Sequence, residues 1–215
     1  MCHHEQKDNK LEKGKRLFMA NIITISRIFI ALFAIILLFF TGVKTYILAF
    51  VLTAIAIWFD GLDGYVARKF NETSKFGAML DILGDRIVEN IYWISFVALG
   101  WLNVVFPLVV VTRGILTDGV RSLAFEKGYT AFGSTTMMKS KLGKFIVASN
   151  FSRFTYAVTK ALAFGLLILA HLPIEYACKQ GVSNVAYACA YISLVFCVVR
   201  GLPVLIESKR FFKNS

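Results

Sequence analysis

Long apolar blocks alternate with short polar segments along most of the chain. Most of these blocks approach the roughly 20 residues that an α-helix needs to cross a bilayer. The pattern predicts six spans, at residues 22–40, 46–59, 76–99, 104–125, a fifth that begins within 145–156 and ends near 172, and 185–206. The fifth is the least sharply bounded, because Arg153 and Lys160 interrupt its apolar run. We therefore expect an all-α integral membrane protein with six transmembrane helices.

The first 20 residues differ from the rest, because they are polar and basic. Leu11, Leu17 and Phe18 would give a short helix here one apolar side. Such a segment is typical of an amphipathic juxtamembrane helix that lies on the membrane surface. The sequence thus divides into this cytoplasmic segment, residues 1–20, and one six-helix membrane domain, residues 21–215.

Composition and charge support a membrane protein and bear on its partners. The chain is 57% hydrophobic and 17% charged, with a formal net charge of +11. Its cations lie between apolar blocks and do not form a continuous exposed face, so they do not indicate nucleic-acid binding. An anionic lipid bilayer and phosphate-bearing substrates are the expected partners.

The distribution of cations predicts the orientation. The loops after spans one, three and five contain only Lys44 and Lys179. The other 22 of the 24 Lys and Arg residues lie in the termini, in the even loops or at the adjoining span ends. By the positive-inside rule, both termini and the even loops face the cytoplasm.

Aspartates are concentrated in one window, residues 60–85, which holds four of the six in the chain. On helices, Asp60 and Asp63 are i,i+3 neighbours and Asp81 and Asp85 are i,i+4 neighbours, so each pair shares a face. If the two helices pack together, four carboxylates converge and repel one another. One or two divalent cations with oxygen ligands, Mg²⁺ or Mn²⁺, would balance them at the cytoplasmic face.

The spacing of this window is D-x₂-D-G-x₂-A-R-x₈-G-x₃-D-x₃-D. It resembles the signature of the CDP-alcohol phosphotransferase family at every fixed position. The resemblance implies six transmembrane helices, a homodimer, and transfer of a phosphatidyl group from a CDP-linked lipid to an alcohol with release of CMP. It also implies two metal ions held by Asp60, Asp63, Asp81 and Asp85, with Asp85 as the general base.

A second segment, N-x-x-T-x-x-R at residues 21–27, resembles the opening of the first span in this family, although Ala20 stands where many members have Pro. Small residues would let a nucleotide approach the backbone, and Arg68 could pair with a phosphate. The residues expected at the CDP-lipid are Asn21, Thr24, Asp60, Gly64, Ala67, Arg68, Ser74 and Gly77. The alternatives are that the glycines only pack helices, that Ser74 only caps a helix, and that Arg27 only snorkels.

The fourth span carries Arg113 and Arg121, about two helical turns apart with Thr117 between them. Buried arginines need an anion, so an acceptor with a phosphate is favoured, bound by Arg113, Arg121, Lys141 and Lys144. This segment resembles that of bacterial phosphatidylglycerophosphate synthases, although Gly114 replaces the usual Glu. The resemblance implies a bacterial-type cell membrane, with CDP-diacylglycerol and sn-glycerol 3-phosphate as substrates and phosphatidylglycerophosphate and CMP as products.

Two alternatives stay open at this point. Within the family, the acceptor could be inositol phosphate, serine or another polar alcohol, with Lys139 and Lys141 serving only to anchor the chain to anionic lipid. In a different class, the four carboxylates could serve a divalent-cation transporter. Such a protein usually places its site near the bilayer midplane between broken helices.

Overall fold

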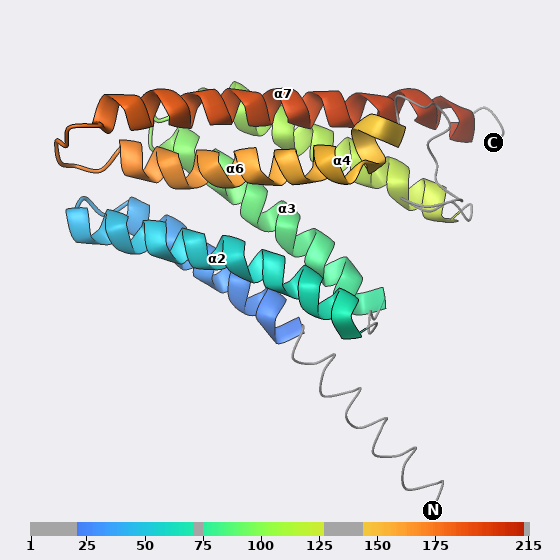
Figure 1. Cartoon of the computed structure of the whole chain (residues 1–215). Coiled ribbons are helices and arrows are strands. Elements are labelled where there is room, and N and C mark those ends of the chain that lie inside the picture. Colours follow the sequence, from blue (N-terminus) through green and yellow to red (C-terminus); the bar gives the residue numbers. More distant parts are fainter. Residues whose placement is uncertain (1–20, 71–74, 127–143, 213–215) are drawn as a thin grey trace, which may run out of the picture. The chain divides into compact units, whose positions relative to one another are not determined.

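The structure is a computed structural model, and it describes residues 21–70, 75–126 and 144–212. All regular structure in these ranges is helical, which confirms the predicted all-α class (Figure 1). The chain divides into two compact units, residues 1–92 with 172–174, and residues 93–171 with 175–215. The amphipathic helix expected within residues 1–20 lies outside the described ranges.

The first unit contains the helix Asn21–Leu38, helix α2 (Val43–Phe70) and most of helix α3 (Lys75–Ala98). A short turn joins the first two helices, and the Thr45 hydroxyl donates a hydrogen bond to the carbonyl of Gly42 at 2.7 Å. This hydrogen bond stabilises the turn where the chain reverses direction.

Helix α2 is longer than the span predicted for it. The apolar portion ends at Gly61, but the helix continues to Phe70. The prediction ended the span at residue 59, where the apolar residues stop. No proline lies in the following segment, so the backbone stays helical. Asp60 and Asp63 are therefore on one continuous helix.

Small side chains line the packed faces of these helices. On the first helix, Ala31 and Ala34 are buried, and on α2 Ala49, Thr53 and Ala56 are buried. Their i,i+3 and i,i+4 spacing puts each set on one stripe. Small residues let membrane helices approach closely. On α2 the same stripe leads, four residues beyond Ala56, to Asp60.

One buried hydrogen bond joins α2 to α3. The Thr53 hydroxyl donates to the carbonyl of Ala49 at 2.7 Å and lies 2.8 Å from the hydroxyl of Tyr92. Because the Thr53 proton is used within α2, Tyr92 is the donor between the helices. This contact fixes α3 against α2 two turns beyond Asp85.

The second unit contains the end of α3, helix α4 (Val105–Glu126), a short π-helix η1 (Lys144–Ala148), helix α6 (Asn150–Ala170) and helix α7 (Lys179–Phe212). Figure 1 shows α6 and α7 side by side, and α4 also contacts α7. Between α3 and α4, Gly100 has a φ of +76°, which favours glycine. The aromatic core includes Trp93, whose ring centroid lies 5.0 Å from that of Phe164.

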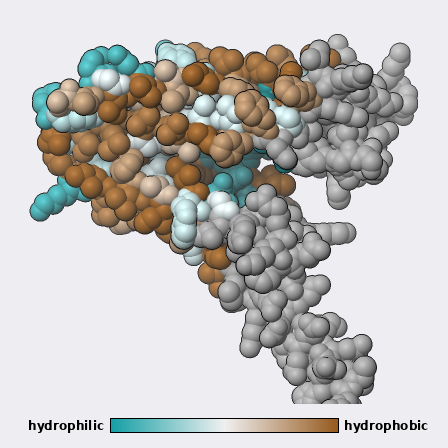
Figure 2. Space-filling view, viewed as in Figure 1, coloured by the Kyte–Doolittle hydropathy of each residue, from teal (hydrophilic) through white to brown (hydrophobic). Residues whose placement is uncertain are grey.

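On the face shown in Figure 2, apolar residues cover most of the described surface. Large hydrophobic side chains such as Phe29, Ile115, Phe151 and Phe154 are at least two-thirds exposed. Within the described residues, four helices are long and apolar enough to cross a membrane: Asn21–Leu38, Val43–Gly61, Phe151–Ala170 and Lys179–Ser208. The chain is thus an integral membrane protein. Helices α3 and α4 have 24 and 22 residues, but they carry several charged residues, so the count of six spans stays a prediction.

We expect Tyr92→Phe to lower the free energy of unfolding by about 0.6 kcal/mol, the mean for a side-chain hydrogen bond between membrane helices. Thermal unfolding in detergent measures this. Tyr191→Phe is the matched control, because the structure gives the Tyr191 hydroxyl no hydrogen bond within the described ranges, and it should leave stability unchanged. Equal stability of both variants would contradict the role given to the Thr53–Tyr92 contact.

Candidate metal centre

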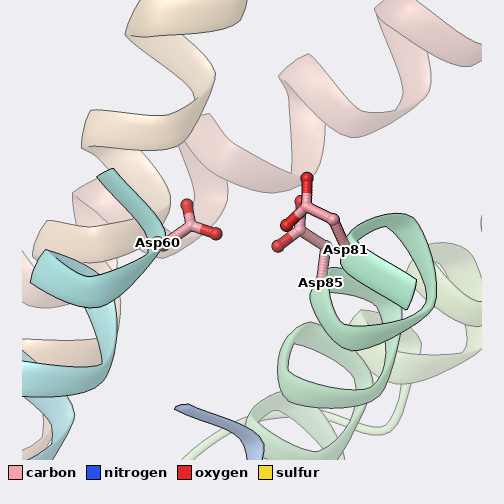
Figure 3. Close-up of side chains that lie close together, drawn as sticks. All are labelled: Asp60, Asp81 and Asp85. Carbon is pink, nitrogen blue, oxygen red and sulfur yellow. The ribbon is translucent and has the colours of Figure 1, made fainter. Parts of the chain in front are cut away.

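Three aspartates from two helices converge in the first unit. Asp60 lies on α2, and Asp81 and Asp85 lie one turn apart on α3. Figure 3 shows their carboxylates pointing toward one another. One oxygen from each lies within 4.8 Å of the others. Each side chain is about half exposed, so an ion or a substrate can reach the carboxylates from solvent.

Arg27, from the helix Asn21–Leu38, faces the same carboxylates. Its Nη1 forms an ion pair with Oδ1 of Asp60. Its Nη2 lies 2.9 Å from Oδ1 of Asp85 and 3.6 Å from Oδ1 of Asp81. The residue is only 2% exposed, and its Nε and Nη2 have no partner in hydrogen-bonding geometry among the residues that the structure describes. The guanidinium is therefore a buried positive charge in contact with three anions.

Gly84 explains how Arg27 comes so close to the aspartates of α3. It is buried on α3 between Asp81 and Asp85. A Cβ atom there would lie 3.0 Å from Nη2 of Arg27 and 3.3 Å from Cγ2 of Thr24. These contacts are tighter than most real ones, so the missing side chain makes room for the first helix. The motif fixes Asp81 and Asp85 but accepts any residue at position 84. Sequence reasoning therefore missed Gly84.

The donor set suits a divalent cation. Carboxylate oxygens are the ligands preferred by Mg²⁺ and Mn²⁺, and three carboxylates converge here. Asp60, Asp81 and Asp85 could hold such an ion together. Asp63 is on α2 three residues after Asp60, so its position on the helix is described, but its side chain is not.

The residues predicted to bind the CDP-lipid are described unevenly. Thr24 is buried, Asn21 is half-buried, and Gly77 lies in the first turn of α3. Ser74 lies outside the described residues. Three more are placed on the α2 backbone, with no description of their side chains: Gly64, Ala67 and Arg68.

Arginines gather in the second unit. On α4, Nη1 of Arg121 pairs with Oδ1 of Asp118 at 3.5 Å, as their i,i+3 spacing predicts. Thr117 is fully buried and donates to the carbonyl of Arg113 at 2.8 Å. The Nε of Arg113 is buried and has no hydrogen-bond partner in the described part of the chain. Lys141 lies outside the described ranges, and Lys144 begins η1 with its side chain undescribed.

Helix α7 adds a cation that sequence reasoning missed. Arg200 is 8% exposed, and its guanidinium donates to Oγ of Ser152 at 2.8 Å and to the carbonyl of Val147 at 3.3 Å. The charges of Arg113, Arg121 and Arg153 all act on it. Within the described ranges, no carboxylate pairs with Arg113 or Arg200. A lone arginine in an otherwise apolar span is itself a signal of function, and it could have identified Arg200.

The next residue, Gly201, leaves space for the Arg113 side chain in this cluster. A Cβ atom on Gly201 would lie 2.7 Å from Cγ of Arg113 and 3.1 Å from its Nε. Because Cγ is near the base of the side chain, it could not easily move away. The bare backbone of α7 thus lets the Arg113 side chain pass beside Arg200.

Comparison with known proteins identifies relatives of the chain. A family model described as CDP-alcohol phosphatidyltransferase matches residues 17–199. A Mycoplasma pneumoniae protein is 42% identical over 77 residues, which are 36% of this chain and 34% of that protein. A Pseudomonas fluorescens protein is 30% identical over 156 residues, which are 68% of this chain and 80% of that protein.

A third relative, from Mycoplasma genitalium, is 31% identical over 126 residues, 51% of this chain and 53% of that protein. All three relatives are named CDP-diacylglycerol–glycerol-3-phosphate 3-phosphatidyltransferase. The matches to the two mycoplasma proteins span about a third and about half of their lengths.

Gly84 gives a direct test of the close approach between the first helix and α3. Gly84→Leu should lower the free energy of unfolding by about 1–3 kcal/mol, as expected for an overpacked core. Gly84→Ala should be nearly neutral, because its new contacts are to side-chain ends and alanine favours the helix. Thermal unfolding in detergent measures both. Gly181→Leu is the control, since no atom lies within 4 Å of a Cβ there. Unchanged stability in Gly84→Leu would exclude the close approach.

Proposed function

The chain belongs to the CDP-alcohol phosphatidyltransferase family, and we propose that it transfers a phosphatidyl group from CDP-diacylglycerol to sn-glycerol 3-phosphate. The products are phosphatidylglycerophosphate and CMP. A bond forms between the acceptor oxygen and the lipid-linked phosphorus, and the bond from that phosphorus to CMP breaks. The observation that carries the proposal is the convergence of Asp60, Asp81 and Asp85 in a chain whose relatives are named for this reaction.

Asp60, Asp63, Asp81 and Asp85 are proposed to hold one or two Mg²⁺ or Mn²⁺ ions. Such ions, when bound, neutralise charge on the pyrophosphate and align the reacting groups. Asp85 is the proposed general base, which takes the proton from the acceptor hydroxyl. Its half-exposed carboxylate supports this role, since a substrate hydroxyl could approach it.

The CDP-lipid is proposed to lie against the first helix, the end of α2 and the start of α3. The buried position of Thr24 near Gly84 supports this, because it brings the first helix to the aspartates. The proposed contacts are Asn21, Thr24, Asp60, Gly64, Ala67, Arg68, Ser74 and Gly77. Arg68 would pair with a phosphate oxygen, and the small residues would admit the nucleotide to the backbone.

The acceptor phosphate is proposed to bind the arginines of the second unit. Arg113 and Arg121 were expected from the sequence together with Lys141 and Lys144, and we add Arg200. Cations buried in a membrane protein are costly without a counter-charge. The orphaned Nε of Arg113 and the electrostatic contact among these arginines support an anion there. Serine carries no phosphate and would leave the cluster unbalanced.

Both termini and the active site are proposed to face the cytoplasm. The distribution of Lys and Arg supports this orientation, with Lys160 as an exception because it lies in the middle of α6. We also propose a homodimer, on the family resemblance alone. Labelling of single cysteines introduced near each terminus, in sealed vesicles, tests the orientation.

The reaction itself is tested by release of CMP from CDP-diacylglycerol with Mg²⁺ or Mn²⁺ and one acceptor at a time. The panel is glycerol 3-phosphate, inositol 1-phosphate, free inositol and serine. Only glycerol 3-phosphate should support turnover, and EDTA should abolish it. Asp85→Asn should reduce the rate by about 10²–10⁴-fold, the usual contribution of a general base.

Turnover with a different acceptor would overturn the acceptor assignment but leave the reaction class. No release of CMP with any acceptor would overturn the proposed function. Near-normal turnover in Asp85→Asn would remove Asp85 from the role of base.

The acceptor pocket gives a separate prediction. Arg113→Ala should raise the KM for glycerol 3-phosphate about tenfold or more, because a hydrogen bond to a charged group contributes about 1.5–3 kcal/mol. The KM for CDP-diacylglycerol should stay close to that of the wild type. Lys179→Ala, which removes a half-buried cation paired with the exposed Glu175 at 3.1 Å, is the control. An equal rise in both KM values would exclude Arg113 from the acceptor pocket.

A further inference from the structure

Arg27 has a position that neither metal binding nor transfer by itself requires. It is one of the most deeply buried charged residues of the described chain, and its guanidinium bridges the two helices that carry the aspartates. One nitrogen pairs with Asp60 of α2, and the other lies closest to Asp85 of α3. Asp60 and Asp85 are also two of the three carboxylates that could hold a divalent ion between α2 and α3.

The contacts of the Arg27 guanidinium with the aspartates resemble those of a counter-ion more than those of a hydrogen-bonded structural ion pair. A structural pair of arginine and carboxylate is commonly bidentate, with two aligned hydrogen bonds. Here Nη2 lies 2.9 Å from Asp85 but is not aligned for a hydrogen bond, and Nε has no partner. Unsatisfied buried donors reduce stability. The attraction is therefore mainly electrostatic, and another cation could supply it.

We propose that Arg27 is an internal counter-cation of the acidic site, which holds Asp60, Asp81 and Asp85 together when no divalent ion is bound. The ion and the guanidinium compete for the same carboxylate oxygens. Arg27 thereby weakens metal binding and stabilises the metal-free protein. This inference rests on the proposed function, since it assumes that the three aspartates hold a divalent ion.

The consequence is a linkage between metal affinity and stability. Without Arg27, the metal-free site contains mutually repelling anions, so the protein loses stability. The ion then no longer has to displace a positive charge and binds more tightly. Because a ligand that binds only the folded state stabilises it, the added ion should recover the lost stability.

The experiment compares wild type, Arg27→Met and Arg27→Lys as full-length protein in detergent micelles. Binding of Mn²⁺ is followed by the electron paramagnetic resonance signal of the free ion, and thermal unfolding is measured in EDTA and in saturating Mn²⁺. Arg27→Met should bind Mn²⁺ about tenfold or more tightly than wild type, within the usual range of coupling between linked events. Its Tm should fall by at least about 4 °C in EDTA and return close to the wild-type value in Mn²⁺.

Arg86→Met is the matched control. Arg86 directly follows Asp85 on α3, but its Nη1 lies 3.5 Å from Oε2 of Glu89. Any stability that this variant loses should be equal in EDTA and in Mn²⁺, and its Mn²⁺ affinity should change far less than that of Arg27→Met. Arg27→Lys keeps the charge but lacks the two terminal nitrogens that contact carboxylates on both helices. Its Mn²⁺ affinity should therefore lie between those of the wild type and Arg27→Met.

Unchanged or weaker Mn²⁺ binding by Arg27→Met would overturn the inference, because Arg27 would then not compete with the ion. Failure of Arg27→Met to fold in both EDTA and Mn²⁺ would also overturn it, because an ion could not replace the guanidinium. The proposed function is judged separately by release of CMP from the wild-type protein. If the wild-type protein releases no CMP but Arg27→Met shows the predicted Mn²⁺ behaviour, the proposed function is rejected and the inference stands.

Discussion

Mutual repulsion among carboxylates is the constraint on which the first unit depends. Two unit charges 4.8 Å apart, the upper limit for these carboxylate oxygens, repel by about 3.5 kcal/mol at an effective dielectric constant of about 20, before the screening that half-exposed groups receive. Three such groups at the ends of apolar helices need a positive charge to stay together. The structure supplies one from Arg27, and the family resemblance implies that divalent ions supply more. The choice of cation then governs both the stability of the site and its chemistry.

The second unit has the opposite requirement. The positive charges of Arg113, Arg121 and Arg153 act on Arg200, and Arg121 forms an ion pair with Asp118. Hydrogen bonds to Ser152 and to a backbone carbonyl orient Arg200 without neutralising it. An anion is the natural complement. The first unit thus gathers acidic side chains and the second gathers basic ones, and the proposed transfer to a phosphorylated alcohol would use both.

The sequence predicted the helices and the aspartates well, because both depend on local spacing. An apolar block of sufficient length predicts a helix, and i,i+4 spacing brings Asp81 and Asp85 to one face whatever surrounds them. The end of the second apolar span was predicted closely, at residue 59 against Gly61, but hydropathy marks only where the apolar residues stop, and the helix itself continues to Phe70. The contacts of Arg27, Gly84, Arg200 and Gly201 depend on residues far apart in the chain, which no local pattern reveals. For Arg200 the only local signal is a single charge in an apolar span.

Packing and chemistry are joined most directly on α2. Ala56 is 3% exposed and lies one turn before Asp60 on the same rigid helix. A larger side chain at Ala56 would push α2 outward, and Asp60 would move with it. Catalytic geometry is sensitive to displacements of about 1 Å, so a residue without any reactive group can determine whether three carboxylates share one cation. Gly84 has the same relation to Asp81 and Asp85 on α3. The small residues of this fold therefore belong to its chemistry as much as to its packing.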